Sequence, residues 1–224
     1  MALKLIEAPE IEPVTVDQAI RHLNEYAEPV DEPEPEDPEG EEPEGEQEPP
    51  EEPEPVDALR EHIADLIATA RESCEEYQNR AYLTQTWELW LDCWPPIITI
   101  PRPPLQSIES IKWYDTANVE HTIEAADYFA DVNSEPGRVL MNPGKSWPAG
   151  LRPVSGICIT FTAGYTEAAN VPRRVRQAIL LLVAEWYLNR EATSLTGKGG
   201  VEKFNREIPF GVTRLLDYDR VVPV

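Results

Sequence analysis

The sequence predicts an α+β fold: a helical bundle with an inserted small antiparallel β-subdomain. Three observations predict it. Apolar residues recur every three or four positions over residues 57–81, which is the period of an amphipathic helix. They alternate in short runs over 84–164, as in strands, and a strongly apolar helical pattern returns over 171–190. Because the strands lie between two helical stretches, the layout is α+β rather than a regular alternation of strands and helices.

A short first helix is predicted to begin just after Val14. Thr15 and Gln18 have the spacing of a capping box, in which each side chain bonds the backbone N–H of the other residue. Val14 can pack against Ala19 across this turn. We therefore expect residues 1–27 to form an N-terminal segment and the first helix.

An acidic insertion, rich in proline and glutamate, is predicted over residues 28–56. The stretch 28–57 carries 16 of the 42 acidic residues of the chain and no Lys or Arg. It has almost nothing to bury and cannot offset the entropy lost on ordering, so we expect it to be disordered and extended. We interpret it as a dispensable, solvated insertion; the alternative is an acidic arm that contacts a partner or lines a channel.

A strong helix is predicted from Asp57 onward. Its apolar positions are spaced by three and four residues, with charged residues between them: Leu59, Ile63, Leu66, Ile67, Ala70, Cys74, Tyr77 and Ala81. One apolar stripe on an otherwise charged helix is typical of a helix that packs on a core. We predict a structural role for it rather than a site.

Short strands are predicted between Thr84 and Gly164. The first follows from alternation that places Trp87 on one face and Trp90 and Trp94 on the other. Prolines after residue 100 end the second strand, because proline cannot donate to a strand ladder. The further strands are predicted at 97–100, 108–114, 127–132, 138–141 and 156–162.

The predicted helix over 171–190 is too apolar to be covered by one core contact. Beyond its main stripe, Leu180, Leu181 and Ala184 extend the apolar surface round the helix. A second partner surface, from this chain or from another copy, is therefore expected. The candidate subunit-packing residues are Leu180, Leu181, Ala184, Trp186 and Tyr187.

Residues 192–224 are predicted to form a hinge and an extended C-terminal tail. A polar, glycine-rich stretch over 192–200 precedes a series of spaced apolar residues. Such a tail has too few neighbours in sequence to form a core of its own. It either docks onto a partner or packs as a strap on its own subunit.

No catalytic, cofactor or metal site is predicted. The three histidines have no metal-ligand or nucleophile motif around them, and Cys74, Cys93 and Cys158 form no CxxC pair. The stretch 196–200 lacks two defining residues of a phosphate-binding loop, because Ala192 and Gly199 stand in place of the first glycine and the Ser/Thr. Three widely spaced cysteines fit a reducing compartment.

Charge and hydropathy exclude two further classes. Outside 28–57 the chain has 26 acidic and 19 basic residues, which argues against general nucleic-acid binding, since that requires clustered Lys and Arg. The longest wholly apolar run, 178–184, is far shorter than a membrane span, and the sequence begins with no signal-peptide pattern. We therefore expect a non-secreted protein with no membrane partner.

Several segments are informative when they are taken in order: 79–89, 100–108, 113–115, 161–165, 171–172, 178–184 and 187–191. In this order they resemble the head–tail connector (adaptor) proteins of tailed phages, a family that also occurs in prophages and gene transfer agents. The resemblance covers about residues 14–27 and 57–191. Its strength lies in the order of the segments, since none is specific alone.

The resemblance implies a structural virion protein with no enzymatic activity and no cofactor. It would be a subunit of a connector ring, of twelve copies, in the virion neck, assembled in the host cytoplasm. The ring would dock under the portal protein, let DNA pass without sequence-specific binding, and link the capsid to a stopper or tail-completion protein. Residues 57–191 would form the connector core.

The resemblance also implies a role for the C-terminal tail, which in the family reaches the neighbouring portal ring. The residues expected to dock are Phe204, Ile208, Phe210, Leu215, Leu216, Tyr218, Val221 and Val222. On this basis, deletion of residues 201–224 is expected to leave the fold intact and to abolish attachment to the portal.

Two other functions stay open from the residues alone. The Trp-rich sheet could form a small ligand- or carbohydrate-binding module, since tryptophan faces stack on sugars, and such a module would be monomeric. A hydrolase could use neighbouring acids such as Glu75 and Glu76. The mass of the protein in solution, alone and with portal, separates the first of these from the connector.

Overall fold

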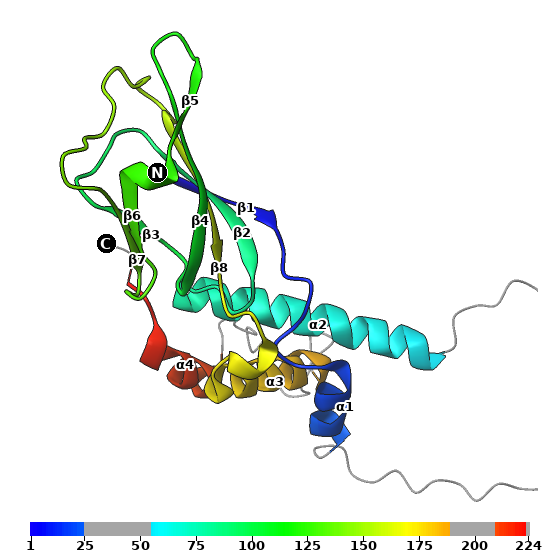
Figure 1. Ribbon diagram of the computed structural model, residues 1–224. Coiled ribbons are helices and arrows are strands. Elements are labelled where there is room, and N and C mark those ends of the chain that lie inside the picture. Colours follow the sequence, from blue (N-terminus) through cyan, green and yellow to red (C-terminus); the bar gives the residue numbers. More distant parts are fainter. Residues whose placement is uncertain (25–54, 189–208, 223–224) are drawn as a thin grey trace, which may run out of the picture.

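A computed structural model describes residues 1–24, 55–188 and 209–222 of the chain. Two antiparallel sheets stand on a layer of helices (Figure 1). The predicted α+β class is confirmed. The predicted insertion over 28–56 and the hinge over 192–200 lie outside the described residues, apart from the last two residues of the insertion, which begin a helix.

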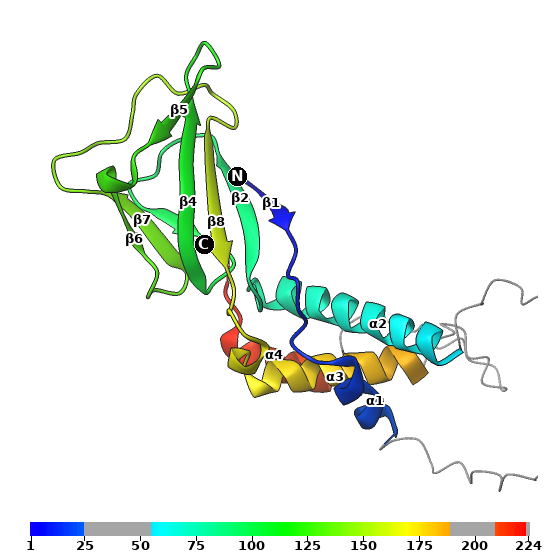
Figure 2. The same cartoon turned by 45° about the vertical axis from the view of Figure 1, so that its right-hand side comes forward.

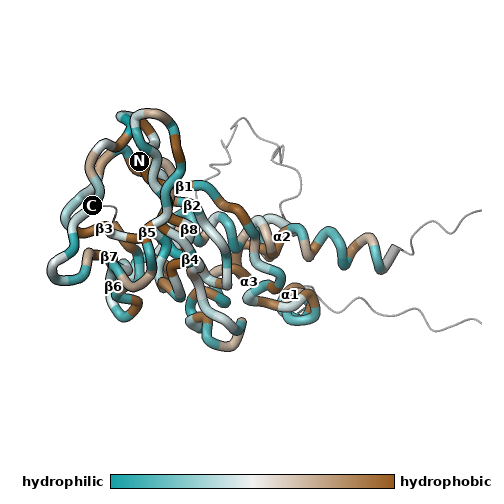
Figure 3. The backbone as a smooth tube through the Cα atoms, turned by 45° about the horizontal axis from the view of Figure 1, so that its top comes forward, coloured by the Kyte–Doolittle hydropathy of each residue, from teal (hydrophilic) through white to brown (hydrophobic). Residues whose placement is uncertain are grey.

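Within the described residues, four α-helices form the helical layer: α1 (Val16–Asn24), α2 (Pro55–Gln78), α3 (Arg173–Leu188) and α4 (Phe210–Leu216). Short 3₁₀ turns lie at Ala125–Asp127 (η1), Ala168–Asn170 (η2) and Asp217–Asp219 (η3). Apolar side chains from all four helices meet in one helical core, which includes Leu23, Ile67, Ile179, Leu182 and Leu216. Along α2, apolar and polar positions alternate in patches, as an amphipathic helix requires (Figure 3).

The predicted capping box at the start of α1 is confirmed. The Thr15 N–H donates to Gln18 Oε1 at 3.1 Å, and the Gln18 N–H donates to Thr15 Oγ1 at 3.2 Å. Val14 and Ala19 are both buried in the helical core. The motif thereby fixes where α1 begins and how the preceding segment enters the helical layer.

The larger sheet has the order β1-β2-β8-β4-β5 and the smaller one the order β3-β7-β6, and every pairing is antiparallel. The larger sheet contains β1 (Ala2–Glu7), β2 (Gln85–Leu91), β8 (Ile157–Ala163), β4 (Leu105–Tyr114) and β5 (Glu120–Ile123). The smaller sheet contains β3 (Ile98–Ile100), β7 (Gly137–Met141) and β6 (Tyr128–Asp131). Strand β8 lies in the middle of the larger sheet, paired with β2 and β4. A separate sheet core forms around Leu89, Ile111, Val139, Ile159 and Phe161.

Two strands and one helix are absent from the sequence prediction. Strand β1 is exposed at all but one position, so its residues give no buried alternation to detect. Strand β5 is only four residues long, and α4 lies where an extended tail is expected. Short or exposed elements carry little periodicity, and contacts with distant parts of the chain decide their structure.

Gly164 ends β8 and turns the chain toward the helices. Its φ of +107° is a conformation that L side chains rarely adopt, and a Cβ there would lie 2.0 Å from Leu83 O. Its N–H donates to Pro104 O at 2.8 Å. Only glycine fits this passage, because the backbones of three segments meet at it.

The tryptophans do not form the predicted arrangement. Trp87 packs against the sheet core, and Trp90 stacks on Tyr114 with ring centroids 6.2 Å apart. Trp94, however, also packs against the sheet core and stacks on Trp147 at 4.5 Å, so its predicted position on the face opposite Trp87 is wrong. The reason is that β2 ends at Leu91, after which strand alternation no longer applies.

The two described ends of the chain lie close together. Met1 and, in β1, Leu3 line a pocket of about 310 Å³ together with Val221 and Val222. Figure 2 shows both ends beside the sheets. The first strand and the last described residues are therefore neighbours.

Candidate functional site

Residues 209–222, here called the C-terminal strap, lie on the chain's own helical layer. Val212 and Leu216 are buried in the helical core, and Leu215 packs against it. The prediction of an extended tail is therefore wrong for this segment. The sequence pattern holds the reason: Val212, Leu215 and Leu216 have the three- and four-residue spacing of a helix, and α4 places them toward α2 and α3.

The end of α2 holds the strap by its backbone. Three consecutive side chains donate hydrogen bonds to strap carbonyls: Gln78 Nε2 to Leu216 O (2.5 Å), Asn79 Nδ2 to Val221 O (3.0 Å) and Arg80 Nε to Asp219 O (2.7 Å). The Val221 N–H in turn donates to Gln78 O at 2.9 Å. Asn79 has a φ of +54°, so the helix ends here and consecutive side chains reach the strap.

Beneath this contact, a buried polar network joins α2 to β2. Glu75 Oε1 accepts hydrogen bonds from the Tyr82 N–H (2.6 Å) and from Gln85 Nε2 (2.6 Å), and Glu75 Oε2 accepts one from Arg71 Nη1 (2.8 Å). Burial raises the pKa of Glu75, and the charge of Arg71 opposes this rise. The Tyr82 hydroxyl donates to Gln78 Oε1 at 2.6 Å, which connects the network to the residue that holds the strap.

This network excludes the proposed acid pair of a hydrolase. Glu75 is 5% exposed and committed to three hydrogen bonds, whereas its neighbour Glu76 is exposed to solvent. The two carboxylates therefore do not face a common substrate. Across residues 1–24, 55–188 and 209–222, no group of three His, Cys, Asp or Glu side chains is placed to hold a metal ion.

The outer face of the strap carries three strongly exposed apolar side chains beside the charged Arg214, Asp217 and Arg220. Phe210, Tyr218 and Val222 are 77%, 81% and 74% exposed. Arg174 of α3 lies over the Tyr218 ring at 4.4 Å and bonds Asp219 at 2.6 Å, so this part of the strap is held in place. Of the predicted docking residues, these three are accessible, Val221 is half-buried, and Leu215 and Leu216 face inward. Phe204 and Ile208 lie outside the described residues.

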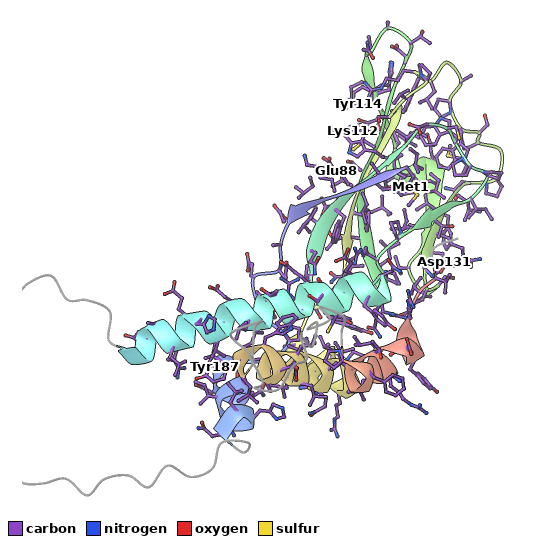
Figure 4. All side chains as sticks on the ribbon, turned by 180° about the vertical axis from the view of Figure 1, so that it is seen from behind. Met1, Glu88, Lys112, Tyr114, Asp131 and Tyr187 are labelled. Carbon is purple, nitrogen blue, oxygen red and sulfur yellow. The ribbon has the colours of Figure 1, made fainter. Side chains whose placement is uncertain are left out.

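The apolar surface of α3 is covered mainly from within the chain. Ala184 is buried, and Leu180, Leu181, Trp186 and Tyr187 are half-buried against the helical core. The second partner surface expected for this helix is thus supplied by α1, α2 and α4. Ala184 cannot meet another copy, whereas the half-buried side chains retain some accessible area. Figure 4 shows Tyr187 at the end of α3 that lies beside α1, far from Asp131 on the smaller sheet.

The residues that hold the strap were not found by sequence reasoning. Gln78, Asn79 and Arg80 read as the end of a helix, and nothing local indicates that three polar side chains turn toward a segment 140 residues later. The helical spacing of Val212, Leu215 and Leu216 is the one local signal for α4. The tail was expected to be extended because it has too few apolar neighbours in sequence, and the helical core supplies those neighbours from distant segments.

Known proteins resemble the chain in both sequence and structure. Residues 152–220 match the family model described as phage gp6-like head-tail connector protein. This part of the chain is therefore similar to a head–tail connector domain. This match spans β8, α3 and the strap as far as Arg220, so it includes the contact just described. The resemblance predicted from the sequence is confirmed.

Solved structures from gene transfer agent (GTA) particles are similar to the chain. A chain in the neck of an empty GTA particle, determined with C6 symmetry, aligns over 100% of this chain and 97% of its own length, with 22% identity and a TM-score of 0.67. A chain of the native GTA virion aligns over 100% and 97%, with 21% identity and a TM-score of 0.65.

A third chain, from the neck of the native GTA particle determined with C12 symmetry, covers 76% of this chain and 90% of its own, with 25% identity and a TM-score of 0.56. No curated protein matches the sequence. In the described part of the chain, no helix is long and apolar enough to cross a membrane.

Proposed function

We propose that this protein is a structural subunit of a head–tail connector ring in the neck of a phage or gene transfer agent particle. The observation that carries the proposal is the connector domain over 152–220 on a fold shared with chains of GTA necks over nearly their whole length. The role is one of assembly and not of catalysis. Its site is a surface rather than a pocket.

In this proposal the ring has twelve copies, docks under the portal protein and passes DNA without reading its sequence. Neck structures determined with C6 and C12 symmetry support a cyclic arrangement. Such a ring closes through heterologous contacts, in which one surface of each subunit meets a different surface of the next. Its far side would hold a stopper or tail-completion protein.

The strap is the proposed portal-docking surface, with its roles divided between two faces. Leu215 and Leu216 anchor it to its own helical core, and Phe210, Tyr218 and Val222 present exposed apolar area to the portal. Large aromatic side chains are the residues that most often dominate interface energies. Because Val212 and Leu216 belong to the core, deletion of 201–224 would damage the fold, contrary to the sequence-based expectation.

The first experiment is the mass of the purified full-length protein in solution, alone and mixed with portal protein, measured by light scattering. A ring-sized species, or one that forms only with portal, is the expected result. A strict monomer that is indifferent to portal would contradict the proposal and favour a ligand-binding module.

Point variants test the docking face without removing core residues. The double variant Phe210→Ala/Tyr218→Ala is expected to weaken co-sedimentation with portal at least about tenfold, since two exposed aromatic anchors are lost. Phe129→Ala is the matched control, because Phe129 is 57% exposed but lies on β6 of the smaller sheet. Equal attachment of the two variants would remove the strap from the proposed interface.

A further inference from the structure

A basic cleft of about 380 Å³ lies between α1 and the first turns of α3, here called the α1–α3 cleft. Residues at four- and three-residue spacing on each helix line it, so it is built from two facing helical stripes. Its charged lining consists of Arg21, Arg173 and Arg176, with His22 beside them. No Asp or Glu is among the residues that line it. Figures 1 and 2 both show α1 lying against α3.

The three arginines of this cleft lack the ion pairs that five other arginines of the described chain form. Arg60, Arg71, Arg80, Arg138 and Arg174 each reach a carboxylate. Within residues 1–24, 55–188 and 209–222, by contrast, Arg21, Arg173 and Arg176 form no ion pair. Gathering like charges without a counter-charge is unfavourable, so the cleft is suited to an anionic group from outside these residues.

Arg176 adds a second, independent observation. Its Nε atom is buried and has no hydrogen-bond partner among the described residues. Buried polar atoms in folded proteins almost always have a partner, so a buried guanidinium nitrogen without one indicates an acceptor still to be supplied. Carboxylates suit this role, because a guanidinium binds them through paired hydrogen bonds.

We propose that the α1–α3 cleft binds carboxylates of the chain's own acidic tract, residues 28–54. That tract is joined directly to α1 through residues 25–27, and it contains 15 Asp or Glu residues and no Lys, Arg or His. A strongly anionic segment thus leaves the same helix that supplies Arg21 to the cleft. The tract then acts as a tethered ligand instead of a dispensable decoration.

The tract is long enough to reach the cleft from both of its ends. Asn24, where α1 ends, and Leu59, near the start of α2, line one small pocket, so the described residues on either side of the tract lie close together. The intervening 30 residues, 25–54, could extend roughly 50 Å and return, at about 3.3–3.6 Å per residue. The cleft lies within the length of α1, about 13 Å for nine residues at 1.5 Å each.

Tethering favours this occupant over a free anion. A segment joined covalently to α1 is present near the cleft at an effective concentration of about the millimolar range. Weak carboxylate–guanidinium contacts can therefore be populated, and the many acids of the tract supply interchangeable partners. Since the cleft is open to solvent, we expect the contact to weaken as salt screens it.

Site-specific photo-cross-linking of the full-length protein tests the contact. Gln177→p-benzoylphenylalanine places the probe on the lining of the cleft without altering an arginine. Trypsin releases the tract as one peptide, 22–60, because it holds no Lys or Arg before Arg60, and releases the probe in peptide 177–190. Irradiation is expected to join these two peptides. Phe129→p-benzoylphenylalanine, on the smaller sheet, is the control and is expected to give no such product.

Charge variants show whether the arginines cause the contact. Arg173→Gln/Arg176→Gln, added to the probe variant, is expected to lower the yield of the product at least about threefold; because trypsin does not cut after Gln, the probe is then released in peptide 175–190. Arg173→Lys/Arg176→Lys is expected to restore part of the yield, since Lys keeps the charge but not the paired hydrogen bonds. Raising NaCl from about 0.05 to about 0.5 M is expected to lower the yield in the same way. An unchanged thermal midpoint in the Gln variant confirms that the fold is kept.

Three results would overturn the proposal. The first is absence of the 22–60 product, or a yield that the arginine variants do not change. The second is a product that, in a mixture of ¹⁴N and ¹⁵N protein, joins peptides from different chains, which would assign the cleft to a neighbouring copy. The third is absence of the product together with arginine-dependent binding of duplex DNA, which would assign the cleft to phosphates.

Discussion

The sheet core and the helical core are assembled from segments with very different separations along the chain. Apart from β1, the strands of the sheet core come from one continuous stretch, 85–163. The helical core joins side chains from Val14 to Leu216, and two long segments outside the described residues lie between its pieces. Bringing together segments that are far apart in the sequence costs more conformational entropy than joining near ones. The stability of the helical core is therefore expected to be more sensitive to the loss of a single contact than that of the sheet core.

Buried polar contacts are concentrated where the helical core meets the sheet core, at the end of α2; this region is here called the junction. Glu75, Gln78 and Tyr82 join α2 to β2 and to the strap through buried hydrogen bonds. Buried polar groups have to be satisfied, and this requirement selects one arrangement of the segments that meet here. We infer that the junction fixes the position of the strap, and that the sheet core forms without the strap.

The largest expected effect is at this junction. Glu75→Ala leaves the Tyr82 N–H and Gln85 without their acceptor and removes one of the carboxylates paired with Arg71. We expect the free energy of unfolding in urea to fall by about 3–5 kcal/mol, as when one partner of a buried ion pair is removed. Glu76→Ala, at the exposed neighbour, is expected to change it by less than about 0.5 kcal/mol. Equal effects of the two variants would contradict a structural role for the network.

The next effect tests the anchor of the strap. Leu216 is fully buried, so Leu216→Ala is expected to lower the free energy of unfolding by about 2–5 kcal/mol, as for other core truncations. Phe210→Ala, on the same helix but exposed, is expected to change stability by less than about 0.5 kcal/mol. The same denaturant titration measures both. A near-zero effect of Leu216→Ala would mean that the strap is not part of the helical core.

The rates at which buried cysteines are alkylated report how often each core opens, because one buried cysteine lies in the helical core and another in β8, a strand of the sheet core. Burial raises the pKa of Cys74 in α2 to about 12 and that of Cys158 in β8 to about 11, so both thiols should resist alkylation at pH 8. Exposed Cys93 is expected to react at once. In Leu216→Ala, we expect faster labelling of Cys74, with Cys158 unchanged, as measured by mass spectrometry of the two peptides. Equal acceleration of both thiols would show that the cores open together.

The smallest effect lies in the acid stability of the smaller sheet. Hydrogen bonds from Ser134 and Arg138 lower the pKa of Asp131 from 3.8 to about 2. Because the folded pKa lies below the unfolded one, this group stabilises the fold above pH 3.8 and loses its contribution as pH falls toward 2. Asp131→Asn is expected to reduce the pH dependence of the thermal midpoint in that range only. An unchanged slope would show that the ion pair does not affect folding.

The elements predicted from the sequence are those with long internal patterns. Three elements show this: α2, α3 and β8. In each, the apolar residues recur at the spacing that places them on a buried face, so the pattern can be detected from the sequence. The capping box at Thr15 is a local motif and was predicted for the same reason. Here the local sequence and the tertiary fold favour the same structure.

The candidate site was less predictable, because distant contacts create it. The tail residues were correctly identified as apolar, but their division into an inward and an outward face depends on α2 and α3. The α1–α3 cleft joins Arg21 with Arg173 and Arg176, which are separated by about 150 residues in the sequence. Neither helix alone shows that the three guanidinium groups converge.

The shared pocket of Met1, Leu3, Val221 and Val222 makes the chain suitable for circular permutation. Chain ends that lie this close can be joined by a short flexible linker, and new ends are best tolerated in exposed polar segments. Opening the chain within the acidic tract would turn α1 into the C-terminal helix and α2 into the first one. The strap would then continue through the linker into β1, which places the surface proposed for the portal in the interior of the sequence instead of at its end.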